Sequence, residues 1–122
     1  MKGKRSIFWV ARCFLLLVLL DGVVTSASAA VLLSSPVTIS TLYTYPQFGG
    51  GDVVVQVSQP LAGCESGFWL SASDPGFKSV YAQLLLARAA RTVLSIWAYS
   101  DQIWTGSSGN TCRIQAVGDL QN

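Results

Sequence analysis

Histidine is absent from all 122 residues of the chain. Imidazole is the commonest general base and metal ligand near neutral pH, so its absence excludes His-dependent triads and imidazole metal sites. Beyond residue 29, no acidic side chain lies within four residues of another, which leaves no paired carboxylates in the local sequence. We therefore expect a protein that is not an enzyme and that uses no metal or other cofactor.

Long apolar runs are also missing, with one exception near the N-terminus. Residues 14–20 are entirely apolar; a short basic stretch precedes them at 1–5, and small residues follow at 25–30. This order is typical of a secretory signal peptide with an A-x-A site at its end. A membrane span needs roughly 20 apolar residues, whereas Arg12 and Asp21 interrupt this run. We predict that residues 1–29 are a cleaved signal peptide, that the mature chain has no membrane span, and that the protein is exported to the periplasm or secreted.

Charged side chains are scarce, and the predicted cleavage changes their balance. The whole chain has eight basic and six acidic residues, a net charge of +2, but four of the basic residues and one acidic residue belong to residues 1–29. The mature chain would carry a net charge of −1. Binding to nucleic acid needs a basic face, so this composition argues against a nucleic-acid partner.

Only three cysteines are present, and Cys13 lies in the predicted signal peptide. Cys64 and Cys112 remain, and an oxidising compartment favours a disulfide between them. We predict this disulfide, which stabilises the fold by roughly 4 kcal/mol in the chain-entropy model.

The rest of the mature chain is rich in short runs of β-branched and aromatic residues. Such runs predict strands at residues 37–45, 53–57, 68–71, 92–99 and 112–117. Residues 30–35 are expected to be a loose lead-in, and Trp69 and Trp97, in mid-strand, are expected in the core. Three glycines at 49–51 supply the positive φ of a tight turn, which makes the first two strands a hairpin.

A single helix is predicted at residues 75–90. Asp74 is expected to cap its first turn, and Pro75 suits the first helical position. One face repeats apolar residues at a period of 3.6, at Phe77, Val80, Tyr81, Leu84 and Leu85. The predicted elements therefore follow one another as three strands, a helix and two strands. This is the order of the five-stranded OB-fold, a Greek-key barrel. We predict one mainly β, OB-fold-like domain over residues 30–122.

The segment from Cys64 to Cys112 also resembles known proteins. It combines a short strand, the helix, an aromatic strand and the loop W-x-G-S-S-G-N-x-C at residues 104–112. In these features, residues 37–119 are similar to small exported bacterial proteins and to the B subunit of subtilase-type AB5 toxins. The resemblance implies an OB-fold, a ring of five subunits and glycan binding, and Ser35 is the one position it proposes for a sugar contact.

The loop at residues 100–111 supplies further candidates for ligand contact. In OB-folds this loop and the turn after the first strand flank the usual ligand face. Trp104 lies there among Gly, Ser and Asn, where we expect few apolar neighbours. Asp101, Ser107 and Asn110 are polar candidates. The alternative is that the glycines and serines only form an exposed turn.

The back of the predicted helix carries Ala82, Leu86 and Ala90. Small side chains let a second backbone approach, which favours an interface in a homo-oligomer; the alternative is that alanine is present only as a strong helix former. The sequence thus predicts an exported, non-catalytic binding module for a glycan or a protein partner. The alternative is a structural or protein-interaction component of the cell envelope that binds no small ligand.

Overall fold

The computed structural model describes residues 30–119, which form six strands and one helix. The strands are β1 (Val31–Leu33), β2 (Ile39–Tyr45), β3 (Asp52–Val57), β4 (Gly67–Leu70), β5 (Ser95–Ile103) and β6 (Thr111–Gly118), and the helix α1 (Phe77–Ala90) lies between β4 and β5. The mainly β class with a single helix is therefore confirmed. The predicted signal peptide lies outside the described residues. Within residues 30–119, no helix has the length and hydrophobicity needed to cross a bilayer.

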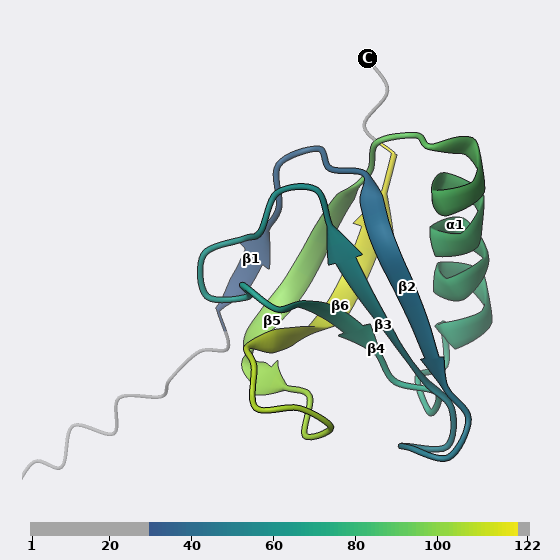
Figure 1. Cartoon of the computed structure of the whole chain (residues 1–122), viewed down its shortest axis with the longest axis vertical. Helices are drawn as coiled ribbons and strands as arrows, with labels where there is room; N and C mark the ends of the chain where they lie inside the picture. The colour runs from purple at the N-terminus through teal and green to yellow at the C-terminus, as the bar shows by residue number, and fades with distance from the viewer. Residues whose placement is uncertain (1–29, 120–122) are drawn as a thin grey trace, which may run out of the picture.

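All six strands belong to one sheet, in the order β1-β5-β6-β4-β3-β2. Neighbouring strands are antiparallel except β4 and β6, which are parallel. The chain connects these two strands through α1 and β5. A bridge between Val37 and Leu94 joins the segment before β2 to the segment before β5. The sheet therefore curls so that β2 and β5 approach each other at one end, with α1 along its side (Figure 1).

The predicted count of five strands and the predicted order of three strands, a helix and two strands are wrong, because the expected lead-in contains β1 and four strands therefore precede α1. In β1, Val31 lies opposite Tyr99 and Leu33 opposite Trp97. Ser34 continues the pairing: its N–H donates to the carbonyl of Ile96, and its Oγ accepts from the N–H of Ile96, both at 2.9 Å. Three residues are too few to show an alternating pattern, so β1 depends on the edge that β5 offers.

The helix begins at Phe77, two residues later than predicted, and Asp74 does not cap it. The N-cap is Gly76, with no side-chain hydrogen bond. The Asp74 carboxylate accepts instead from the guanidinium of Arg113, and a charge-assisted bond of this kind outcompetes a neutral backbone donor. Leu84 and Ala87 are the buried helix residues, whereas Leu85, predicted for the core face, is exposed.

The core lies inside the curled sheet, with α1 packed against it. Its buried members come from every long strand and from the helix, and include Ile39, Val55, Phe68, Leu84, Ile96 and Ile114. The predicted disulfide is confirmed: Cys64 and Cys112 are bonded and fully buried in this core.

The expectation that Trp69 and Trp97 lie in the core is wrong, because both side chains are only partly buried. Strand residues alternate between the two faces of a sheet. On these two strands the residues that point into the core are the sequence neighbours of the two tryptophans, namely Phe68, Leu70, Ile96 and Ala98.

Candidate functional site

One row of side chains crosses the outer face of the sheet. Tyr43 of β2 lies opposite Val54 of β3, and Val54 lies opposite Trp69 of β4. Trp69 lies opposite Arg113 of β6, which in turn lies opposite Tyr99 of β5. Directly opposed residues point to the same face of a sheet, so these five side chains form one continuous set, the outer row.

Two loops meet at one end of this face. The turn between β2 and β3 and the loop between β5 and β6 lie together at the lower end of the molecule in Figure 1. The ring of Trp104, in the second loop, packs against Tyr45 at 4.8 Å and Phe48 at 5.0 Å between ring centroids. Trp104 is only 5% exposed. The expectation that it has few apolar neighbours is therefore wrong.

Asp52 holds the two loops together. Its Oδ2 accepts a hydrogen bond of 3.1 Å from Nε1 of Trp104, and its Oδ1 accepts one of 3.2 Å from the N–H of Ala72. Gly49 has a φ of +60°, and the Asp52 carboxylate fills the space that a Cβ at this position would need. The predicted glycine turn is confirmed, and Asp52 is buried beneath it rather than exposed as an ordinary turn residue.

A groove of about 360 Å³ opens between these loops and the outer face of β2 and β3. Its walls combine aromatic rings with hydroxyl groups, from Tyr43, Tyr45, Trp104, Ser66, Ser107 and Ser108. Tyr43 is 46% exposed, and its ring lies 6.3 Å from that of Tyr45. We call this hollow the loop groove.

The structure brings only some of the predicted ligand-binding candidates together. Trp104 and Ser107 line the loop groove, whereas the exposed residues Ser35, Asp101 and Asn110 do not. Asn110 lies at the base of the same loop, where its Nδ2 donates to Oε2 of Glu65 at 3.2 Å. Contact of any of the five with a ligand stays a prediction.

Glu65 receives hydrogen bonds that favour its ionised form. The N–H of Gly63 donates to Oε1 at 2.8 Å, and this bond is the largest cause that lowers the pKa of the Glu65 carboxyl below its ordinary value of 4.5. The N–H of Glu65 itself and the amide of Asn110 lower this pKa further. The carboxylate therefore links the turn before β4 to the loop before β6.

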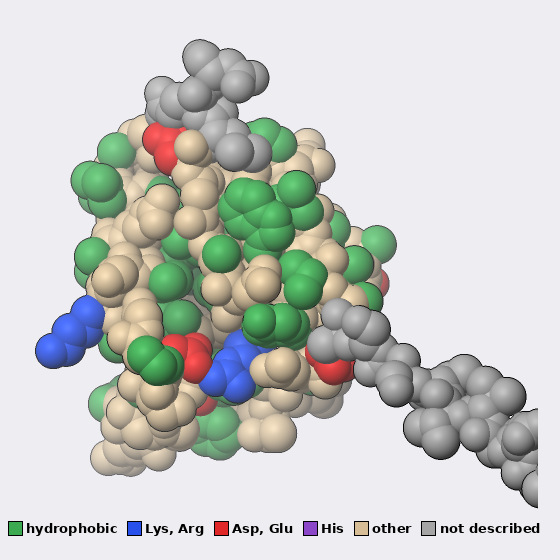
Figure 2. All heavy atoms as spheres, turned by 180° about the vertical axis from the view of Figure 1, so that it is seen from behind, with side chains coloured by type: hydrophobic (Ala, Val, Ile, Leu, Met, Phe, Trp, Pro, Cys, Tyr) green, Lys and Arg blue, Asp and Glu red, His purple; other side chains and the backbone are tan. Residues whose placement is uncertain are grey.

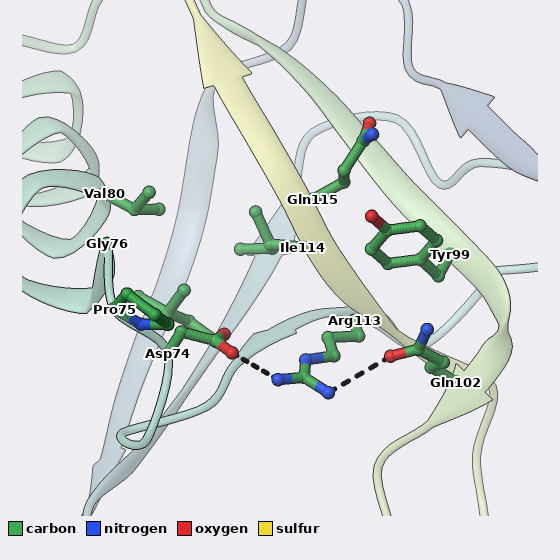
Figure 3. Close-up of a pocket in the computed structure, with 10 residues that line it drawn as sticks. Asp74, Pro75, Gly76, Val80, Tyr99, Gln102, Arg113, Ile114 and Gln115 are labelled. Carbon is green, nitrogen blue, oxygen red and sulfur yellow. Dashed lines mark hydrogen bonds and ion pairs between the residues drawn. The ribbon is translucent and has the colours of Figure 1, made fainter.

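A second hollow, of about 390 Å³, lies at the other end of the outer row, where Arg113 and Tyr99 line it. Its polar side chains converge from the turn before α1, from β5 and from β6, as Figure 3 shows: Asp74, Tyr99, Gln102, Arg113 and Gln115. Leu70, Val80 and Ile114 supply its apolar part. We call it the Arg113 crevice.

Arg113 is held from three directions in this crevice. One guanidinium nitrogen donates to Asp74, and another donates to Oε1 of Gln102 at 3.2 Å. The guanidinium carbon lies 5.4 Å from the centre of the Trp69 ring, within range of a cation–π interaction. The indole N–H of Trp69 in turn donates to the carbonyl of Gln102 at 3.0 Å.

Sequence reasoning overlooked the Arg113 crevice, although a signal for it existed. Arg113 stands between Cys112 and Ile114, both buried, so strand alternation places it outward. The capping role expected of Asp74 concealed its pairing with Arg113.

Figure 2 shows the face that carries β5 and β6, where hydrophobic and neutral polar side chains dominate and charged ones are few.

The predicted interface residues Ala82, Leu86 and Ala90 are all exposed on α1. Leu86 is 68% exposed, and with Val93 it borders a small hollow of about 80 Å³ between the helix and the segment before β5. In the described part of the chain, no three Asp, Glu, Cys or His side chains gather closely enough to hold a metal ion.

Comparison with known proteins returns no match, whether the chain is scanned against family models or searched against curated proteins and solved structures. The function must therefore be inferred from the geometry of the two hollows.

Proposed function

We propose that the protein is an exported, non-catalytic binding module that takes a neutral glycan in the loop groove. One observation carries this proposal: the rings of Tyr43 and Tyr45 and the hydroxyls of Ser107 and Ser108 border a single hollow. A sugar ring presents apolar C–H groups on its faces and hydroxyls at its rim. Aromatic rings with polar tips, together with nearby hydroxyl groups, complement both features.

The charge of the groove supports a neutral ligand. None of the side chains that line it is ionisable as Asp, Glu, Lys or Arg. An anionic or cationic ligand would lose hydration there without gaining an opposite charge. A neutral polyhydroxyl compound loses less and finds hydrogen-bond partners in Gln56, Ser66 and the loop serines.

The arrangement of strands supports the same site. Without β1, the order is β2-β3-β4-β6-β5, with one parallel pair and the Val37–Leu94 bridge near its ends. We propose that these five strands form an OB-type barrel to which β1 is an addition. The loop groove then lies where OB-folds bind oligosaccharides, at the loops after the first and fourth strands. Kinship with the B subunits of subtilase-type toxins is part of this proposal.

Export is supported by the buried disulfide, because disulfides persist mainly in oxidising compartments. The periplasm and the medium both satisfy this condition.

The second candidate is a protein-interaction component of the cell envelope. It is favoured by the apolar surface beside α1 where Leu86 and Val93 are exposed and border one small hollow. Large exposed apolar side chains close together favour association, and the ring of subunits implied by the toxin resemblance would use this surface. A homo-oligomer is compatible with either candidate.

A glycan array probed with the mature chain, residues 30–122, tests the proposal. We expect binding to a limited set of neutral glycans, and loss of this binding in Tyr43→Ala. Gln59→Ala, at an exposed position after β3 that does not line the groove, is the control and should bind as the wild type does. An array without signal would remove the glycan proposal and leave the protein-interaction candidate.

A further inference from the structure

We infer that the Arg113 crevice is a second subsite for the same ligand, so that the protein binds a linear oligosaccharide across the sheet rather than a single sugar. This inference rests on the proposed function. It assigns a binding role to Arg113, Gln115 and Tyr99 and sets the length of the ligand.

The two hollows are similar in size and complementary in position. Their volumes are about 390 and 360 Å³, each near the lower end of the roughly 300–1,000 Å³ typical of small-molecule sites. Tyr43 borders the loop groove at one end of the outer row, and Tyr99 borders the crevice at the other. Four strand spacings separate these residues, a path of about 19 Å along the sheet. This is the length of a short oligosaccharide.

The residues between the hollows connect them. Gln102 lines the crevice and Trp104, two residues later, lines the loop groove. Trp69, at the centre of the outer row, is fixed by its indole hydrogen bond to Gln102 and by the guanidinium of Arg113. A chain that passes from one hollow to the other would cross this segment and stay in contact with protein.

The polar groups of the crevice fit a neutral, polyhydroxyl ligand. The charge of Arg113 is already balanced by Asp74, so an anionic group is not required. A guanidinium has five N–H donors, and the bonds to Asp74 and Gln102 hold it in place without using all of them. Planar amide and guanidinium groups can each contact two adjacent hydroxyls, and a group already held in place loses little entropy on binding.

The rival explanation is that Arg113 only fastens β6 to the turn before α1. Binding of oligosaccharides of increasing length separates the two explanations. The probes are the cello-, malto- and chito-oligosaccharides of one to six units, measured by isothermal titration calorimetry with the mature chain. We expect affinity to rise by about tenfold or more between the shortest member that binds and members of four to five units, and then to level off.

Gln115→Ala is the main variant, because Gln115 is exposed and its loss should not disturb the core. It should weaken the longest oligomers about tenfold and leave the shortest unchanged, whereas Tyr43→Ala should weaken both. Arg113→Lys is the second variant; it retains the charge but not the planar donor pair, and should act as Gln115→Ala does.

Equal affinity for one unit and for six, or an equal effect of Gln115→Ala on both, would overturn the inference while glycan binding in the loop groove stands. If no member of the three series binds, the inference is also wrong. The array result then shows whether the proposed function fails with it.

Discussion

Trp104 and Asp52 are joined by a hydrogen bond of 3.1 Å from the indole Nε1 to Oδ2, across 52 residues of sequence. Both side chains are buried, and the other oxygen of Asp52 accepts from the N–H of Ala72. One carboxylate therefore fixes the loop between β5 and β6 relative to the turn between β2 and β3. The shape of the loop groove depends on this connection.

Replacement of Asp52 by Asn should destabilise the protein by about 1–3 kcal/mol, because hydrogen bonds to a buried charged group are among the stronger ones. The Asn amide offers one acceptor oxygen where the carboxylate offers two. Urea unfolding of the mature chain measures the change. Asp101→Asn, at an exposed position, is the control and should stay within about 0.5 kcal/mol of the wild type.

Trp104→Phe completes a double-mutant cycle with Asp52→Asn. The coupling energy should fall in the range of about 0.5–3 kcal/mol found for residues in contact. Additive effects would mean that the bond does not hold the loops together. Trp104→Ala is less informative for binding, since truncation of this buried ring would cost about 3–5 kcal/mol.

Removal of the disulfide by the double substitution Cys64→Ser and Cys112→Ser should lower the free energy of unfolding by roughly 4 kcal/mol. The bond closes a loop with a sequence separation of 48, and its loss increases the entropy of the unfolded chain. Urea unfolding with and without reductant measures the effect. A loss below about 1 kcal/mol would show that the core alone determines stability.

Glu65 should contribute stability that depends on pH. Its pKa is lowered in the folded protein, chiefly by the hydrogen bond from the N–H of Gly63. A group with a lowered pKa stabilises the folded state above its ordinary pKa, here 4.5, and this contribution is lost as the pH falls through the folded value. Thermal melting of the wild type and Glu65→Gln at decreasing pH tests this.

The two melting curves should differ at neutral pH and converge below pH 4.5. Because Glu65 is exposed to solvent, the difference should also shrink at high salt. A constant difference at every pH would assign the effect of the substitution to lost packing rather than to ionisation.

The helix surface predicts self-association. Leu86 is 68% exposed at the centre of the expected interface. Sedimentation velocity of the mature chain should show an oligomer, and Leu86→Lys should shift it to a monomer. Gln59→Lys, which introduces the same charge in an exposed bend after β3, should leave the sedimentation unchanged. A monomeric wild type would contradict both the interface and the ring implied by the toxin resemblance.

Local patterns were sufficient for most of the fold. The β-branched runs located β2 to β6, the apolar period located α1, and the count of cysteines left one possible disulfide. The strands and the helix follow from patterns within a few residues, and the disulfide follows by elimination. By contrast, β1 forms because residues about 65 positions further along the chain offer a partner strand.

Competition between distant groups explains the errors at the candidate site. Asp74 is a good N-cap residue by local rules, but Arg113, 39 residues away, takes its carboxylate. Trp104 is isolated in its own loop sequence, but the rings that cover it come from the end of β2 and the turn after it. The position of the loop was predictable from strand order, whereas which of its side chains face the groove depends on the tertiary contacts.

The central claim is that a neutral glycan binds in the loop groove. Its most direct test is an NMR titration of the ¹⁵N-labelled mature chain with a glycan selected on the array. We predict chemical-shift changes at Tyr43, Ser107 and Ser108, with Gln59 and Leu86 unchanged. Shift changes confined to Ser35, Asp101 or the helix, with none in the groove, would contradict the account.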